Sequence, residues 1–191
     1  MIEYSPFEKP LKELEAEDLE VLTRAYEGWH IEYKEEVPKA PAIAKSVSAF
    51  ANTQGGWLFY GIEEKSKDDP VAGSFPGIDR ANVESLWQRI QQAVPGNATP
   101  PPYFDIKVVW GPCDVIGLAA DKGIICIHVR WSLAAPHVHR DGRIYRRVGD
   151  QSDPKPENDR FLLDQLWRRA DTFKQSYKEW IERDQAFSDS D

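Results

Sequence analysis

The chain has 191 residues, 41% of them hydrophobic, and a formal net charge of −8 at pH 7. This length suits one globular domain, or one domain with terminal extensions, and it can fold without disulfides or a structural metal. The acidic balance argues against a simple nucleic-acid coat protein, whose surface is basic, but it leaves room for a local basic groove.

Cysteine usage and the amino terminus indicate the cellular setting. The two cysteines, Cys113 and Cys126, have a spacing that matches no zinc motif, and Cys126 lies in an apolar run that predicts burial. Residues 1–4 lack the basic start and apolar core of a signal peptide, and no window approaches 18 consecutive apolar residues. We therefore expect a cytoplasmic protein that has no membrane contact.

Hydrophobic periodicity predicts the elements of the fold. Residues 29–34 alternate between apolar and polar side chains, which is typical of a half-buried strand, whereas 57–62 is apolar on both faces and predicts a central strand. In chain order we predict helix 12–26, strand 29–34, helix 41–51, strand 57–62, helix 80–94, strands 104–110 and 123–131, a hairpin over 137–148, and helices 157–170 and 172–185.

This order predicts an α+β fold, with a mixed β-sheet packed against helices. The expected organisation is a helical extension over 1–26, a central domain over 27–155 and a second helical extension over 156–191. Asp141-Gly142 between alternating segments predicts a hairpin with a type I′ turn. At the end of helix 41–51 we expect structural roles for Asn52, which tolerates left-handed geometry, and for Gly55 and Gly56, which allow close approach of the next strand.

Four stretches carry the functional signal, and they stand in a fixed order. They are EGWHIEYK at 27–34, SAFANTQGG at 48–56, YGIEEK at 60–65 and DGRIYRRVG at 141–149. Together they resemble the Schlafen AlbA-like family, which is associated with binding nucleic acid. The resemblance implies an α+β domain that binds RNA or single-stranded nucleic acid rather than duplex DNA.

The resemblance also implies a candidate catalytic site. Some members of the family are RNA endonucleases that act on tRNA or rRNA through three acids, and the matching positions here are Glu27, Glu32 and Glu64. The third position departs from the family pattern, which has Asp there, and Glu63 is an alternative. Three such carboxylates would hold Mg²⁺ or Mn²⁺, which polarises a phosphate and activates a nucleophile.

A structural interpretation of the same acids stays open. Glu27 then only decorates the end of a helix, Glu32 pairs with Lys34 across a solvated face, and Glu63 and Glu64 are loop acids.

The second candidate site is basic. Arginine forks suit phosphate groups, and an aromatic ring between them suits stacking on a base. In the strand after the turn, Arg143, Tyr145 and Arg147 are expected to share one face. The predicted nucleic-acid contacts are Lys34, Arg140, Arg143, Tyr145, Arg146 and Arg147. The alternative is an exposed hairpin whose arginines balance acidic neighbours.

A function without catalysis also fits this sequence. The seven tryptophans and the helices expected over 157–185 could serve a protein-interaction or sensor module that forms a homo-oligomer through its carboxyl-terminal helices.

Overall fold

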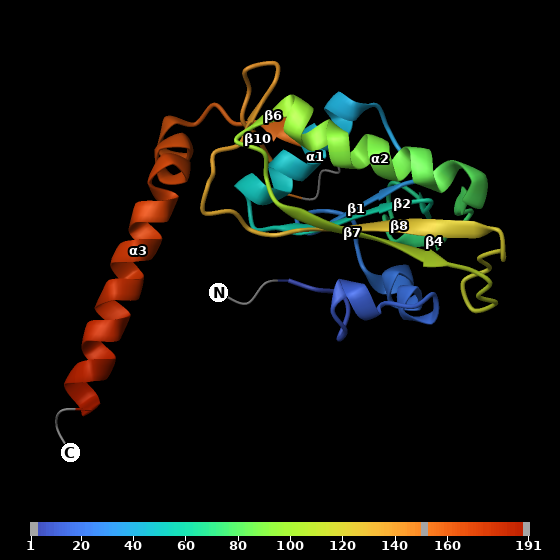
Figure 1. The fold of residues 1–191 in the computed structure, drawn as a ribbon, viewed down its shortest axis with the longest axis horizontal. Coiled ribbons are helices and arrows are strands. Elements are labelled where there is room, and N and C mark those ends of the chain that lie inside the picture. The colour runs from blue at the N-terminus through green and yellow to red at the C-terminus, as the bar shows by residue number, and fades with distance from the viewer. Residues whose placement is uncertain (1–3, 150–152, 189–191) are drawn as a thin grey trace.

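The computed structural model describes residues 4–149 and 153–188, with side chains as far as residue 182 (Figure 1). The helices are the 3₁₀ helices η1 (Leu11–Glu13) and η2 (Glu17–Arg24) and the α-helices α1 (Ala40–Asn52), α2 (Arg80–Asn97) and α3 (Arg160–Ser188). The strands are β1 (Ile31–Lys34), β2 (Gly56–Tyr60), β3 (Glu63–Glu64), β4 (Ala72–Ser74), β5 (Ile78–Asp79), β6 (Ala98–Thr99), β7 (Phe104–Trp110), β8 (Lys122–Val129), β9 (Val138–His139), β10 (Tyr145–Arg146) and β11 (Lys155–Pro156).

A five-stranded mixed sheet forms the centre of the fold. Its strand order is β1-β2-β8-β5, with β7 pairing along β8. Strands β1 and β2 are parallel, and the other pairs are antiparallel. Parallel neighbours need a crossover connection, which α1 provides. The predicted α+β fold with a mixed sheet is thus confirmed.

The sheet separates two hydrophobic cores (Figure 1). Helices α1 and α2 cover one face, where Phe50 and Ile90 pack against Leu58 of β2. The 3₁₀ helices cover the opposite face, where Leu19 and Leu22 pack against Ile31 of β1. Because β1 lies between both layers, its alternating side chains enter both cores. The side of β1 that carries Glu32 therefore faces α1 and not water.

The amino-terminal segment differs from the single helix predicted over 12–26. It forms two separate 3₁₀ helices, in which Val21 is exposed, and Tyr26 beyond them is also exposed. Leu19 and Leu22 are fully buried and lie three residues apart, the spacing that aligns side chains on a 3₁₀ helix. The packing of these two leucines in the core therefore favours a 3₁₀ helix over the predicted α-helix.

The turn from α1 into β2 shows why glycine occupies positions 55 and 56. Gly55 has a φ of 77°, and a Cβ atom there would lie 2.7 Å from the carbonyl oxygen of Val129. A Cβ atom on Gly56 would lie 2.5 Å from the ring of Phe50. Close approach of the strands thus requires both glycines. Asn52, in contrast, is helical and does not adopt the left-handed conformation.

Helix α2 runs three residues beyond its predicted end at position 94 and includes Pro95. The amide of the Asn97 side chain donates to the carbonyl oxygen of Ala93 at 2.8 Å, and the backbone N–H of Ala98 donates to Val94. These two bonds satisfy carbonyls that a helix end would otherwise leave free. The side chain of Asn97 therefore completes the final turn.

The turn predicted at Asp141-Gly142 is present, but its type differs. The N–H of Gly142 donates to the carbonyl of His139, and the N–H of His139 donates to the carbonyl of Arg143. Only Gly142 has positive φ, at 82°, whereas a type I′ turn requires it at two residues. The pattern is that of a three-residue loop with glycine at its last position. Beyond the turn the two arms separate, and β9 pairs with β6 while β10 pairs with β11.

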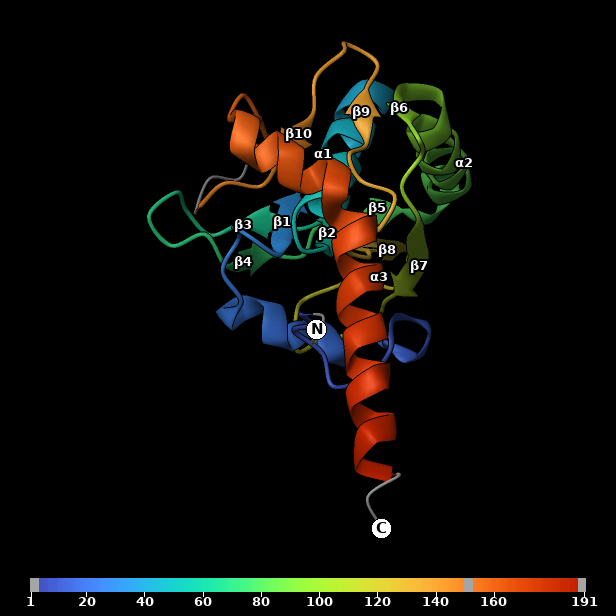
Figure 2. The same ribbon diagram turned by 90° about the vertical axis from the view of Figure 1, so that its left-hand side faces the viewer.

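The carboxyl-terminal residues form one continuous helix, α3, and not the predicted two. No glycine or proline interrupts its sequence, so the backbone continues past residue 171. The helix projects away from the rest of the molecule in Figure 1, and in Figure 2 it crosses in front of the body and extends beyond it. Among the described residues, no helix combines the length and the apolar character needed to cross a bilayer.

Candidate functional site

Glu32 lies under α1, where its carboxylate is 3% exposed. One carboxylate oxygen accepts a hydrogen bond from Ser46 at 2.9 Å, and the other lies 2.7 Å from Nη1 of Arg147. The Nζ atom of Lys34 is 3.9 Å from the Glu32 carboxylate. Burial raises the pKa of Glu32, while Arg147 and then Lys34 lower it. The expected pairing of Glu32 with Lys34 therefore exists, but it lies at the edge of a buried cluster.

Arg147 is completely buried and holds the carboxyl-terminal loops against β1. Its Nε donates to the carbonyl of Gly28 at 3.0 Å, and its guanidinium lies over the ring of Phe50, 4.6 Å from the centroid. The backbone N–H of Arg147 donates to the hydroxyl of Thr53. This placement contradicts the prediction that Arg147 contacts nucleic acid. The alternation expected for a strand ends at β10, so Arg147 does not share an exposed face with Arg143.

Glu27 and Glu64, two of the three acids named by the family resemblance, both line a pocket of about 390 Å³ that Lys34 and Lys67 also line. Glu27 accepts a hydrogen bond from the backbone N–H of Tyr33 at 3.1 Å. The pKa of Glu27 is raised to about 7, chiefly by burial. Lys34 and the bond from Tyr33 act to lower this pKa, whereas the contact with Glu64 and the charge of Glu32 act in the same direction as burial.

Glu63 does not join the pair. Its side chain is turned toward Ser74, whose hydroxyl donates to it at 3.0 Å.

The described residues do not fit a metal site built from three carboxylates. Glu27 and Glu64 share the pocket, but both oxygens of Glu32 already accept bonds from Ser46 and Arg147. Among residues 4–149 and 153–182, whose side chains the structure describes, no three His, Cys, Asp or Glu side chains are placed to hold a metal ion. Positive charge beside these acids instead comes from the chain itself, through Arg147 and Lys34.

Two exposed arginines lie at the turn after β9, and a half-buried lysine of α1 lies beside them. The side chains of Arg140 and Arg143 are exposed, and Nζ of Lys45 on α1 lies 4.9 Å from the ring centroid of Tyr145. We call Lys45, Arg140 and Arg143 the basic turn. Within the described part of the chain, none of the three has an acidic side chain at ion-pair distance; Arg140 binds the neutral amide of Asn97 at 3.1 Å.

Asp141 organises the basic turn. Its carboxylate accepts bonds from the hydroxyl of Tyr145 at 2.7 Å and from the backbone N–H of Arg143 at 3.0 Å, and Nδ1 of His139 lies 3.0 Å away. Desolvation raises the pKa of Asp141, but the bonds from Tyr145, His139 and Arg143 outweigh it and lower the pKa to about 2. The turn is therefore held in one shape by a carboxylate whose charge is already compensated.

Two other residues that were predicted to contact nucleic acid instead contact groups within the protein. Tyr145 is buried, so its ring cannot receive a stacked base. Arg146 forms an ion pair with Glu157 at 2.7 Å, and both side chains are largely buried. The sequence pattern placed both residues just after the turn, but it did not show which side chains they contact.

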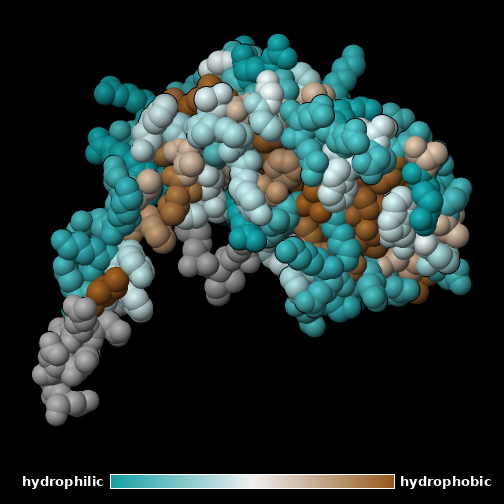
Figure 3. All heavy atoms as spheres, viewed as in Figure 1, coloured by the Kyte–Doolittle hydropathy of each residue, from teal (hydrophilic) through white to brown (hydrophobic). Residues whose placement is uncertain are grey.

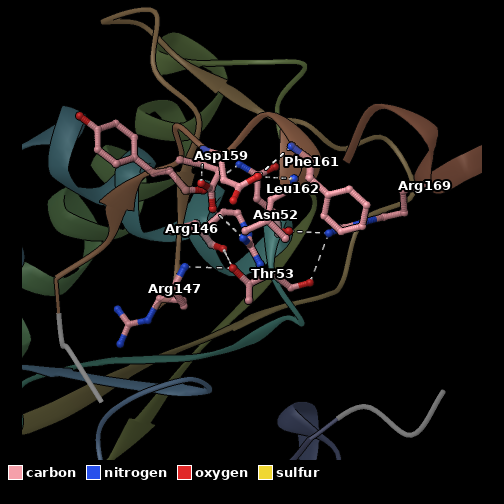
Figure 4. A network of polar contacts seen from close by, with 11 residues as sticks. Asn52, Thr53, Arg146, Arg147, Asp159, Phe161, Leu162 and Arg169 are labelled. Atoms are coloured by element: carbon pink, nitrogen blue, oxygen red, sulfur yellow. Dashed lines mark hydrogen bonds and ion pairs between the residues drawn. The ribbon is translucent and has the colours of Figure 1, made fainter. Parts of the chain in front are cut away.

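Sequence reasoning missed a polar network around the end of α1 (Figure 4). The Asn52 side chain accepts from the N–H of His137 at 2.7 Å and donates to the carbonyls of His137 and Tyr145. Arg169 of α3 donates to the carbonyls of Ala51 and Asn52, at the negative end of the α1 dipole. Asn52 thus has a structural role, as expected, but it acts through its side chain, which positions the loops that carry the basic turn.

Comparison with known proteins agrees with this architecture. A family model described as Schlafen, AlbA_2 matches residues 27–156. The chain belongs to the Schlafen AlbA_2 family. Membership in this family suggests that residues 27–156 form a nucleic-acid-binding domain.

Solved structures add little beyond the family. The chain is similar to the DIP2311 protein of Corynebacterium diphtheriae, with 24% identity and a TM-score of 0.43. The match covers 73% of this chain and 24% of that protein, so the chain spans about a quarter of the length of that protein. In the sequence comparison, no curated protein matches.

Proposed function

We propose that this Schlafen AlbA_2 domain binds RNA or single-stranded nucleic acid through the basic turn. The observation that carries the proposal is the position of Arg140 and Arg143, which are exposed and have no acidic partner among the described residues, on a chain whose net charge is −8. Elsewhere, cations such as Lys65 and Arg168 form ion pairs with neighbouring acids. Cations left without such partners are available to phosphate groups.

The small size of the basic turn favours a flexible strand over a duplex. Lys45, Arg140 and Arg143 can contact only a few phosphates, and the acidic balance of the chain opposes a long, straight polyanion. A single strand can bend its backbone to follow the turn, whereas duplex DNA holds its phosphates at fixed positions. The buried ring of Tyr145 argues against stacking on that side chain, so the proposal rests on phosphate contacts.

Replacing both arginines tests this proposal. We expect Arg140→Ala together with Arg143→Ala to lower the affinity for single-stranded RNA roughly ten- to a hundredfold, and to reduce the slope of log K against log salt by about 1 per lost contact. Binding is measured by fluorescence anisotropy at several salt concentrations, with single-stranded RNA and duplex DNA of equal length.

The matched control removes two positive charges from a different surface. Arg168→Ala together with Lys178→Ala does so on α3, where both cations already pair with acids. Equal losses of affinity in both double variants would assign binding to net charge alone. An unchanged affinity in the Arg140 and Arg143 variant would remove the proposal.

Cleavage of RNA with Mg²⁺ or Mn²⁺ is a second candidate function. The approach of Glu27 and Glu64 in an open pocket supports it, whereas the engagement of Glu32 with Arg147 opposes it. Incubating the purified chain with tRNA and Mn²⁺ beside the Glu64→Gln variant, which leaves the buried Glu32–Arg147 ion pair intact, decides the matter. We expect no cleavage by either protein; cleavage by the wild type that the variant loses would establish a nuclease.

A further inference from the structure

The outer part of α3 carries a row of exposed aromatic side chains. Phe173, Tyr177 and Trp180 are 46%, 54% and 52% exposed. Their rings follow one another along the helix, with centroids 6.4 Å and 6.1 Å apart, and Phe173 reaches Trp131 of the body at 6.2 Å. In Figure 3, this part of α3 stands clear of the rest of the molecule. Contiguous exposed aromatics of this kind mark an interaction surface.

The helix that carries this row has little support from its own domain. α3 is 29 residues long, about 43 Å at 1.5 Å per residue, and residues 171–180 are all exposed. Among the described residues, its contacts with the domain lie near its start: buried Leu166, the bonds of Arg169 to the end of α1, and the ring contact of Phe173 with Trp131. Helices in proteins gain most of their stability from packing of an apolar face. The outer turns therefore need a partner to pack against.

The spacing of the apolar residues indicates that this partner is another helix. Ala170, Phe173, Tyr177 and Trp180 follow one another at steps of three, four and three; Leu166 starts the same row four residues before Ala170 but is buried in its own domain. Alternating steps of three and four are the a and d positions of a heptad, the pattern by which two helices pack along a common seam. A flat or irregular partner surface would not require this repeat.

The charges along α3 indicate which helix is suited to pack against it. In the sequence, residues 160–174 hold four cations, Arg160, Arg168, Arg169 and Lys174, and two anions, Asp164 and Asp171. The rest of α3, residues 175–188, holds two cations, Lys178 and Arg183, and three anions, Glu179, Glu182 and Asp184. This distribution opposes the helix dipole, which favours anions near the first turn and cations near the last. A second copy running antiparallel would place its acidic half beside the basic half and oppose the dipole.

We infer that α3 pairs in antiparallel orientation with α3 of a second copy of this chain, and that Phe173, Tyr177 and Trp180 form the centre of the interface. The same patch then serves both copies, as two-fold symmetry requires. Because α3 projects away from its domain, the two domains lie at opposite ends of the helix pair. Phe173 of one copy faces Tyr177 of the other, and Ala170 faces Trp180. This inference does not depend on nucleic-acid binding.

Light scattering after size-exclusion chromatography tests the inference on the full chain. The wild type is expected to have twice the chain mass of 21.8 kDa. Phe173→Glu together with Trp180→Glu is expected to give 21.8 kDa, because carboxylates at the seam are not tolerated. Thr172→Glu, also exposed on α3 but outside the seam, is the matched control and should remain dimeric. Circular dichroism of each variant checks that the domain is folded.

The other outcomes overturn the inference. A wild type of single mass at every concentration would exclude self-pairing, and a dimer that survives both glutamates would place the contact on another surface. Loss of the dimer in Thr172→Glu to the same extent would show that the seam is not specific.

Cysteine cross-linking tests the orientation. Lys174→Cys is near the two-fold axis of an antiparallel pair and should form an intermolecular disulfide on oxidation, whereas Ala170→Cys should not. The reverse result would indicate a parallel pair and would overturn the antiparallel arrangement. Cys113 and Cys126 are buried, so they should not contribute.

Discussion

Arg147→Met is expected to lower the free energy of unfolding by about 3 to 5 kcal/mol, the range found when one partner of a buried ion pair is removed. Arg147 is 0% exposed, and its guanidinium lies 2.7 Å from the Glu32 carboxylate. Methionine fills a similar volume but leaves Glu32 as an uncompensated charge beneath α1. It also removes the bonds that Arg147 donates to the carbonyl of Gly28. Urea denaturation of both proteins measures the difference.

A double replacement separates loss of charge compensation from loss of packing. Glu32→Leu together with Arg147→Met removes both charges, and we expect it to be more stable than Arg147→Met alone. The control is Arg143→Met, which replaces an exposed arginine of the same loop and should change stability by less than about 0.5 kcal/mol. If Arg147→Met is as stable as that control, the ion pair does not hold the loop in place.

Glu27→Gln is expected to change the pH dependence of stability. The pKa of Glu27 is about 7 in the folded chain, chiefly because of burial, against an ordinary value of 4.5. Between these values the folded state binds more protons than the unfolded state, so stability falls as the pH rises from 4.5 to about 7 and is level above it. A shift of this size corresponds to about 3 kcal/mol at 1.36 kcal/mol per pH unit. Glutamine does not titrate, so the stability of the variant does not show this fall as the pH rises.

The measurement is urea unfolding of both proteins at several values between pH 4.5 and pH 8. The stability of Glu27→Gln relative to the wild type should increase across that interval and then remain constant. Glu63→Gln is the control, because its side chain is exposed on the neighbouring strand and turned toward Ser74. A difference between Glu27→Gln and the wild type that is the same at every pH would contradict the burial of an ionisable Glu27.

The regular elements were predictable because their signals are local. Strand β1, helix α1 and strand β2 lie close to their predicted bounds, since apolar periodicity and the glycines after α1 act within a few residues. The same local reasoning failed where a distant contact decides. The amino-terminal leucines, for example, select 3₁₀ helices when they pack on the sheet.

The sequence indicated some of the residues in the candidate site, but it did not indicate how these residues contact one another. The family resemblance named Glu27 and Glu64 as site residues, and in the structure both line one pocket. The role of Arg147 did not follow, because a guanidinium suits solvent, phosphate or a buried carboxylate equally well in a sequence. Only the packing of its loop against Phe50 and Gly28 selects the carboxylate of Glu32.

The sequence by itself determined the family, the α+β composition, and the segments that carry acidic and basic side chains. These properties depend on neighbours along the chain, and motifs record them directly. Only the tertiary structure decided that Arg147 compensates the charge of Glu32, that Arg140 and Arg143 are exposed, and that α3 projects as one helix. Each of these outcomes depends on which distant groups exclude water from a side chain, and burial of that kind exists only once the chain has folded.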